Sequence, residues 1–444
     1  MQNEKDLFEC RRNSIKKVLY KALETDYYRK KLKNINIDGI TYDEFKKIPT
    51  LNKQTLNFNM LGMLTSKYKY FDSEFYRNLP YNQKRKYLEK NGLELKVTSG
   101  STGSPIEVIK SKEDINRDYI TLNWYRRKLT TYDFKGRFIW IWPVNPLIRS
   151  YFYPDAETNV FWDVNNYGTQ YMLYSYSEEN LKILYEYIVE NKVEWLTSSP
   201  NALVNFIDYM EKNSIQIDTI KYIECHSEYL YDWQKEKIIQ AFNCEVVSIY
   251  SSNEMQFIGG TCKCGHMHLF DSSCFMELLD NRHGGKDVYI TSLNYLDIPI
   301  IRYKLGDCGE WENEQQCRLL NNKKIFLLKK YRENDYIVGL NGKKYEPFII
   351  TDSIVFLMNS FNLSIDLYRV KQVDINRFEY YFDESVHVFD LDECKKVLEN
   401  YLESVLNYTI VVDIYKTPIK EFTYDGSKFR YFEVDSELLS RLTQ

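Results

Sequence analysis

The chain reads Thr98-Ser99-Gly100-Ser101-Thr102-Gly103-Ser104-Pro105 directly after the strand-like run 93–97. This stretch holds five hydroxyl groups and two glycines in eight positions. Glycine permits backbone conformations that turn successive amides toward one anion, and Ser and Thr donate further hydrogen bonds to it. No Lys-Ser/Thr pair follows the second glycine, so this is not a Walker loop. The stretch predicts a phosphate-binding loop of another kind, although similar polar turns also occur in loops that bind nothing.

The composition is typical of a large enzyme. A chain of 444 residues predicts two or three domains, and a formal net charge of -4 gives no general reason to expect nucleic acid. No apolar run approaches the roughly 18 residues needed to span a bilayer, and residues 1–6 lack the apolar stretch of a signal peptide. The nine cysteines are dispersed, which favours reduced thiols or metal ligands over disulfides. We therefore expect a cytoplasmic monomer or homodimer that binds neither nucleic acid nor membranes.

Strand and helix patterns alternate through the first three quarters of the chain. The helix predicted at 177–191 begins with Ser177 and two glutamates and then spaces its apolar residues at helical intervals. The other predicted elements are strands at 138–142, 194–197, 220–223 and 246–250 and helices at 201–212 and 231–242. This rhythm predicts βαβ units and a mainly parallel sheet flanked by helices, which is an α/β fold.

The pattern changes in the last quarter. After about residue 270 short strands and turns follow one another, and the tail from about 332 returns to strands and helices of its own. We expect a large N-terminal domain at 1–331 and a small α+β domain at 332–444.

Polar clusters follow several predicted strands. Ligands of open α/β sheets lie beyond the carboxyl ends of the strands, so these clusters are candidate sites. The loop at 98–105 is the first of three such clusters, which we expect to converge on one edge of the sheet, and two more follow predicted strands. Asp307 is predicted to end a further apolar strand after Gly306. A single acidic residue after a strand is more often a turn residue or a helix cap. The two clusters are Cys225-His226-Ser227-Glu228 and Ser251-Ser252-Asn253-Glu254.

Taken in order, these segments resemble the adenylate-forming superfamily, and most closely its phenylacetate-coenzyme A ligase-like branch. The resemblance spans most of the chain and rests on the joint order and spacing of motifs that are weak one by one. Besides the loop at 98–105, the matching segments are 199–203, 227–230, 250–254, 299–307, 331–335 and 425–430. It implies a large domain followed by a small mobile one, and a reaction in two steps. A carboxylate first attacks the α-phosphate of ATP to give an acyl-adenylate and pyrophosphate, and a nucleophile then displaces AMP.

The resemblance assigns roles to particular residues. The β- and γ-phosphates of ATP would lie against the loop, and Thr102 would take part in catalysis. Glu254 would bind Mg²⁺, which suits a hard cation that bridges phosphate oxygens. Lys428 would neutralise the charge that develops when the carboxylate meets the α-phosphate, and Arg332 belongs to the hinge segment. The loop residues with this role are Ser99, Gly100, Ser101, Thr102 and Gly103.

The remaining roles concern the nucleoside and acyl groups. Asp307 would accept hydrogen bonds from both ribose hydroxyls, because an ionised carboxylate offers two acceptor oxygens. The adenine and acyl pockets would be lined by His226, Ser227, Glu228, Tyr250, Ser251, Ser252 and Asn253. The chain departs from the family pattern at Ser104, where many members carry Lys, and at Ser427, where a Gly commonly precedes the lysine.

A separate group of soft ligands lies at Cys262-Lys263-Cys264-Gly265-His266-Met267-His268, with Cys317 further on. Thiolate and imidazole are the ligands that zinc prefers, and a structural site uses four of them. Relatives in the same branch share a structural zinc between a Cys-x5-His segment and a later cysteine-bearing loop. The resemblance therefore favours Cys262, Cys264, His268 and Cys317 as ligands, with His266 in reserve. The alternative is a set of reduced cysteines in a β-turn.

The expected activity is ATP-dependent activation of an aromatic or small carboxylic acid and its transfer to a thiol, with coenzyme A as the first candidate. One alternative is an adenylating ligase whose acceptor is an amine, a hydroxyl or a carrier-protein thiol, as in polysaccharide or specialised metabolite pathways. A second alternative is a catalytically weakened homologue that binds nucleotide.

Overall fold

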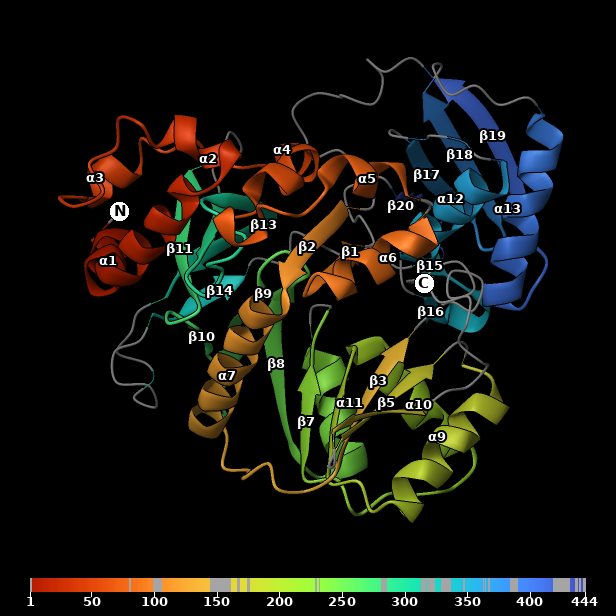
Figure 1. The fold of residues 1–444 in the computed structure, drawn as a ribbon. Helices are drawn as coiled ribbons and strands as arrows, with labels where there is room; N and C mark the ends of the chain where they lie inside the picture. The colour runs from red at the N-terminus through yellow and green to blue at the C-terminus, as the bar shows by residue number, and fades with distance from the viewer. Residues whose placement is uncertain are drawn as a thin grey trace.

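The structure is a computed structural model of the 444-residue chain (Figure 1). The residues that it describes exclude 1, 80, 99–105, 144–160, 166–167, 174–175, 228–229, 231, 281–285, 313–316, 318–323, 329–336, 346–347, 362, 364, 366–367, 384–389, 418–431, 436–437, 439–440 and 442–444.

The largest sheet has eight strands in the order β10-β9-β8-β7-β6-β3-β5-β4. Its five middle strands run parallel, β4 pairs antiparallel with β5 at one edge, and β9 pairs antiparallel with both β8 and β10 at the other. The predicted mainly parallel sheet is therefore confirmed. The strands are β3 (Phe138–Pro143), β4 (Phe161–Asn165), β5 (Gly168–Leu173), β6 (Trp195–Ser198), β7 (Tyr222–Cys225), β8 (Glu245–Ser252), β9 (Gln256–Thr261) and β10 (Met267–Leu269).

Three helices pack on one face of this sheet: α9 (Glu178–Glu190), α10 (Pro200–Lys212) and α11 (Asp232–Phe242). Ser177 caps α9, because its hydroxyl accepts a hydrogen bond from the Asn180 amide, and Ser199 caps α10 in the same way. The apolar stripes of these helices bury every second residue of the middle strands in one core. The helix α7 (Lys112–Leu129) lies on the other side of the sheet (Figure 1).

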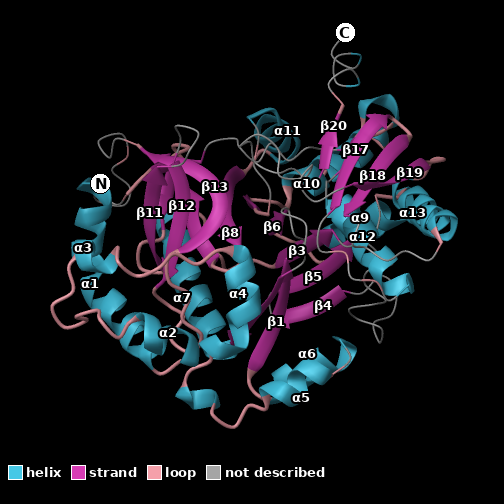
Figure 2. Ribbon diagram, turned by 90° about the horizontal axis from the view of Figure 1, so that it is seen from above, coloured by secondary structure: helices cyan, strands magenta, loops and turns pink. Residues whose placement is uncertain are grey.

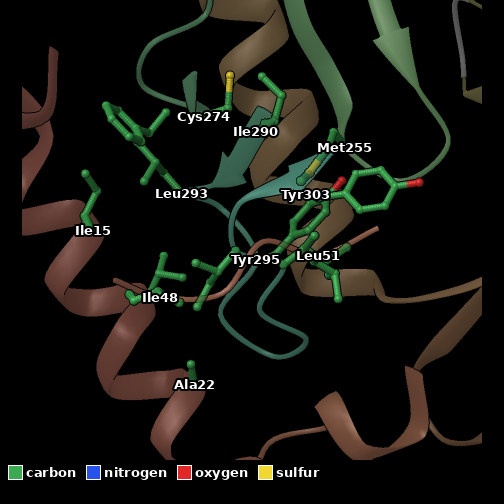
Figure 3. Packing of buried hydrophobic residues seen from close by; sticks show 14 of the residues in the cluster. Ile15, Ala22, Ile48, Leu51, Met255, Cys274, Ile290, Leu293, Tyr295 and Tyr303 are labelled. Carbon is green, nitrogen blue, oxygen red and sulfur yellow. The ribbon is translucent and has the colours of Figure 1, made fainter. Parts of the chain in front are cut away.

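A second, antiparallel sheet has the order β11-β12-β13-β14. Its strands are β11 (Cys274–Asp280), β12 (Lys286–Ser292), β13 (Tyr303–Trp311) and β14 (Phe326–Leu328). The N-terminal helices share one core with it, part of which Figure 3 shows. These helices are α1 (Gln2–Leu23), α2 (Asp26–Lys31), α3 (Tyr42–Phe45), α4 (Lys53–Asn59), α5 (Ser73–Asn78), α6 (Tyr81–Lys90) and the 3₁₀ turns η1 (Met60–Met63) and η2 (Ser66–Tyr68).

One buried ion pair joins the N-terminal helices to the second sheet. Arg302 donates from Nε and Nη2 to the two carboxylate oxygens of Glu277, at 2.9 and 3.0 Å. Its Nη1 donates to the carbonyl oxygens of Lys46 and Ile48, both at 2.6 Å. Arg302 is 5% exposed and Glu277 is 1% exposed, so the charges depend on each other for solvation.

The predicted phosphate loop does not follow a strand of the parallel sheet. The run at 93–97 forms β1 (Leu93–Thr98), which pairs only with β2 (Ile106–Ser111) as a separate antiparallel hairpin among the described residues. The expectation that the strand before this loop belongs to the parallel sheet is therefore wrong. The alternation of apolar and polar residues at 93–97 is typical of a half-buried hairpin rather than a central parallel strand.

The chain from 337 onward has its own core and its own sheet, with the order β19-β18-β17-β20. Seen from above, β17, β18 and β19 and the antiparallel sheet β11–β13 lie on opposite sides of the molecule (Figure 2). The predicted boundary at 331/332 lies outside the described residues. The elements are β15 (Ile337–Val338), η4 (Leu340–Gly342), β16 (Lys344–Tyr345), α12 (Phe348–Phe361), β17 (Tyr368–Asp374), β18 (Arg377–Asp383), α13 (Leu391–Leu406), β19 (Val411–Thr417) and β20 (Phe432–Val434).

None of the helices in the described part of the chain combines the length and the apolar character that a membrane span requires.

Candidate functional site

Glu254 lies at the tip of the hairpin that joins β8 to β9. Ser252 pairs with Gln256 across the base of this turn, and the Ser252 hydroxyl accepts a hydrogen bond of 2.9 Å from the Met255 amide. The Glu254 carboxylate accepts a hydrogen bond of 2.9 Å from the Tyr303 hydroxyl, and the residue is 9% exposed. The position of this carboxylate is therefore set by the turn on one side and by β13 on the other.

Lys110 on β2 holds the base of the same hairpin. Its ammonium group donates to Gln256 Oε1 at 2.8 Å and to the Tyr295 hydroxyl at 2.5 Å. Gln256 has a φ of +56°, a conformation that is uncommon for residues other than glycine. Lys110 is 1% exposed, and burial lowers its pKa to about 7, against the opposing effect of Asp118. The sequence analysis missed this residue.

Asp307 lies close to Tyr250. The Tyr250 hydroxyl donates to Asp307 Oδ2 at 2.7 Å. Asp307 does not end a strand, which corrects the sequence prediction: β13 continues through it to Trp311. Gly306 has a φ of +87°, and the register between β12 and β13 shifts at this point. The resulting β-bulge alters the direction of the side chains beside it, as bulges near active sites commonly do.

The chain leaves β7 at His226 and Ser227, next to β8. Cys225 pairs with Ser248 in the parallel register, and the His226 amide donates a hydrogen bond of 3.0 Å to the Ser198 carbonyl at the end of β6. His226 Nδ1 and Ser227 Oγ are 2.7 Å apart, and the imidazole ring lies edge-on to Trp140 with ring centres 6.1 Å apart. Burial lowers the pKa of His226 to about 4, so its imidazole is neutral at pH 7. A neutral imidazole can accept or donate a hydrogen bond at this edge.

A buried ion pair supports β7 beneath His226. Arg126 on α7 donates to both carboxylate oxygens of Glu224, at 2.7 and 2.5 Å, and the Tyr222 hydroxyl donates to Glu224 at 3.0 Å. The guanidinium carbon also lies 5.2 Å from the ring centre of Trp195. These contacts fix the strand that carries the candidate site residues to α7.

Three of the cysteines predicted as metal ligands lie together. The sulfur atoms of Cys262, Cys264 and Cys317 are all within 4.8 Å of one another, and those of Cys262 and Cys317 are 3.7 Å apart. Two thiolates bound to one tetrahedral zinc ion at about 2.3 Å would be about 3.8 Å apart. Burial raises the pKa of Cys262 to about 11, so its thiol is protonated unless a cation is bound.

The histidines near these cysteines are placed differently from one another. His268 is 1% exposed and pairs with Gly260 in β10, but it is not part of the group within 4.8 Å. His266 Nδ1 is buried and has no hydrogen-bond partner among the residues that the structure describes. The cysteine group therefore offers three ligands, and His266 and His268 are the two candidates for the fourth.

Several predicted site residues lie outside the described part of the chain. They are Ser99, Gly100, Ser101, Thr102, Gly103, Glu228, Arg332 and Lys428. Among the described ones, Ser251 and Ser252 end β8, and Asn253 lies beside Glu254 in the turn.

Solved structures with a similar fold include an acyl-coenzyme A ligase. 2-Hydroxyisobutyryl-coenzyme A ligase, in complex with its acyl-AMP and coenzyme A in the thioesterification state, superposes with a TM-score of 0.60. The identity is 14%, and the match covers 98% of this chain and 91% of the ligase. An open form of the same ligase gives a TM-score of 0.53 over 96% of this chain and 90% of that one, at 12% identity. The chain has the adenylate-forming fold.

The sequence is also similar to that of a curated protein. Protein CapK from Staphylococcus aureus is 24% identical over 315 residues, which is 70% of this chain. The chain spans 64% of the length of that relative. No family model matches the sequence.

Proposed function

We propose that this protein activates a carboxylic acid with ATP, forms an acyl-adenylate and releases pyrophosphate, as a relative of the phenylacetate-coenzyme A ligase-like branch. The observation that supports this most is the placement of Tyr250, Asp307 and Glu254. A hydrogen-bonded Tyr-Asp pair and a carboxylate at a hairpin tip lie at the end of β8 in a chain with the adenylate-forming fold.

In this proposal Asp307 binds the ribose. Its ionised carboxylate can accept hydrogen bonds at both oxygens, and Tyr250 donates to Oδ2. The Tyr250 contact orients the carboxylate toward the ribose hydroxyls. His226, Ser227, Glu228 and residues 251–253 line the adenine and acyl groups, and a neutral His226 adds no charge beside the adenine.

Glu254 suits a magnesium ion that bridges phosphate oxygens. A carboxylate oxygen is the ligand that this hard cation prefers, and Tyr303 occupies one oxygen of Glu254 while orienting the group. When bound, the ion would supply charge neutralisation at the phosphates. The loop residues Ser99 to Gly103 would hold the same phosphates by their amides and hydroxyls, with Thr102 closest to the chemistry.

The second step transfers the acyl group to a thiol, with coenzyme A as the first candidate. The solved ligase with this fold is complexed with coenzyme A, which supports that choice for this chain. An amine, a hydroxyl or a carrier-protein thiol as acceptor remains the alternative, and a nucleotide-binding homologue without activity is the second.

The test of the function is pyrophosphate release with ATP, Mg²⁺ and a panel of aryl, fatty and amino acids, each with and without coenzyme A. Acid-dependent release establishes adenylation. Stimulation by coenzyme A identifies the acceptor, and release without such stimulation assigns another acceptor. ATP binding without release for any acid would favour the inactive homologue.

The ribose assignment predicts a defect in ATP affinity. Asp307→Ala should raise the dissociation constant for ATP at least about tenfold, because two hydrogen bonds to a charged acceptor are lost. Tyr250→Phe should have a smaller effect in the same direction. Isothermal titration with ATP measures both.

Asp287→Asn is the matched control, since this carboxylate lies on the neighbouring strand β12 in register with Cys308 and pairs with Lys304. It should leave ATP affinity within a factor of about two. An Asp307→Ala protein that binds ATP as well as the wild type contradicts the ribose role.

We also propose that Cys262, Cys264 and Cys317 hold a structural zinc ion, with His268 or His266 as fourth ligand. The sulfur spacing supports this, and so does the turn that follows β9: Gly265, at a φ of +86°, donates its amide to the Cys262 carbonyl. Bound zinc would hold the segment after β9 to the loop that carries Cys317.

Protein purified without chelator should contain about one zinc ion per chain. Cys262→Ser should lower the zinc content to well below one ion and lower the melting temperature, as measured by elemental analysis and thermal denaturation. Cys10→Ser, which changes an exposed cysteine on α1, should alter neither. Of His266→Ala and His268→Ala, the variant that loses zinc identifies the fourth ligand. Wild-type protein with far less than one zinc would rule out the site.

A further inference from the structure

Lys110 is a fully buried lysine that the proposed chemistry leaves without a role. It lies near the end of β2, the strand that follows the predicted phosphate loop in the sequence. Its ammonium group is 2.8 Å from Gln256 Oε1, 2.5 Å from the Tyr295 hydroxyl and 4.7 Å from the Tyr295 ring centre. The side chain therefore links β2 to the Glu254 hairpin and to the turn after β12, where Tyr295 lies.

The charges around Lys110 are arranged to keep it in place. Asp118 on α7 is 1% exposed and attracts the ammonium group, and it accepts a hydrogen bond of 2.9 Å from Asn294. Asp114, one turn earlier on α7, accepts hydrogen bonds from the amides of residues 296–298. Glu254 also attracts Lys110. A single ammonium group thus lies among buried carboxylates from two elements.

Burying an ammonium group is unfavourable for stability alone. A methionine of similar length would fill the same space without the desolvation that a charge requires, and such replacements are often neutral or stabilising when both partners of a pair are exchanged. The contact with Gln256 offers a reason for the charge. Gln256 lies two residues from Glu254, at the base of the turn, in a backbone conformation that its own side chain does not favour.

We propose that Lys110 is a positioning residue that holds Gln256, and through it the Glu254 carboxylate, in the place where a divalent cation meets the phosphates of ATP. The inference rests on the proposed function, since it takes Glu254 as the magnesium ligand. Because β2 also leads out of the phosphate loop, one short strand would connect the two parts of the site that must meet at the metal-bound phosphates.

The experiment is isothermal titration of ATP into the full-length protein, once with excess Mg²⁺ and once with a chelator. The variants are Lys110→Met, Glu254→Gln and the double variant. Lys110→Met should weaken ATP binding about tenfold in Mg²⁺ and less than about twofold in chelator. In the Glu254→Gln background, Lys110→Met should cause no further loss, because its effect passes through Glu254.

Gln256→Leu provides a second route to the same test if Lys110→Met does not fold. It keeps the lysine and removes the link, so it should reproduce the Mg²⁺-dependent loss. Lys67→Met is the matched control. Lys67 pairs with Asp297 at 2.7 Å, and the Asp297 amide donates to Asp114. Asp297 belongs to the turn after β12 and not to the Glu254 hairpin, so ATP binding should not change.

Equal losses with and without Mg²⁺, or losses that add to that of Glu254→Gln, would overturn the positioning role and indicate a general structural one. A wild-type protein that binds no ATP would overturn the proposed function itself, and this failure is recognised before any substitution is made. A wild type that binds ATP equally well with and without Mg²⁺ would remove the metal role of Glu254 and the inference with it.

Discussion

Lys428→Ala is expected to slow adenylate formation at least about 100-fold while ATP binding changes little. Two anions, the carboxylate and the α-phosphate, must approach each other in this step, and negative charge grows on the phosphate oxygens. Removing a preorganised positive group from such a transition state costs several kcal/mol, roughly 3 to 4 by comparison with the loss of one oxyanion donor. Acid-dependent pyrophosphate release under ATP saturation measures the effect.

Lys420→Ala is the control for this assignment. Lys420 and Lys428 both lie in the segment 418–431, outside the described residues, so only kinetics distinguishes them. The resemblance implies that the catalytic lysine follows Gly426 in the sequence, which favours Lys428. If Lys428→Ala stays within a factor of about two of the wild type and Lys420→Ala carries the loss, the register of the motif is wrong.

Arg302→Met is expected to lower the free energy of unfolding by about 3 to 5 kcal/mol. Glu277 is 1% exposed, and the substitution removes the bidentate partner of its carboxylate. The backbone carbonyls of Lys46 and Ile48 also lose their hydrogen-bond donor. Burial already raises the pKa of Glu277 against the effect of Arg302, so loss of the guanidinium favours the protonated acid. Urea unfolding followed by circular dichroism measures the change.

The double variant Arg302→Met, Glu277→Met distinguishes the loss of the ion pair from the cost of a buried, unpaired carboxylate. It should recover at least about half of the lost stability, because no unpaired charge then remains buried. Lys237→Met, which removes an exposed ion pair with Asp208, should cost less than about 1 kcal/mol. A cost for Arg302→Met as small as that of Lys237→Met would contradict the account of this pair.

Local sequence was sufficient for four of the five parallel strands, whereas β5 was not predicted. Continuous apolar runs such as 138–142 became central strands, and Ser177 began α9 at the predicted residue. These signals are local, because a cap and an apolar stripe lie within a few residues of each other along the chain. The run at 93–97 was misassigned to the same sheet although its alternation is that of a hairpin strand.

The details of the candidate site depend on contacts between distant residues. Three contacts join residues that are far apart in the sequence. The separations are 57 residues for Tyr250 and Asp307, 146 for Lys110 and Gln256, and 55 for Cys262 and Cys317. The two cysteines were proposed together only through a resemblance to known relatives, and Lys110 was not proposed. A lysine in a predicted strand is expected to lie on the surface, because most lysines are exposed.

The sequence by itself determined the α/β class, four of the five parallel strands with the three helices that pack on them, and the residue types that suggest an adenylating site. Only the tertiary structure decided that the loop at 99–105 joins a separate hairpin, that Asp307 lies at a bulge within β13, and that a buried lysine holds the base of the Glu254 turn. The physical reason is the range of the interactions. Periodicity and capping act over a few residues, whereas strand pairing, bulges and buried charges are settled by partners that only folding brings together.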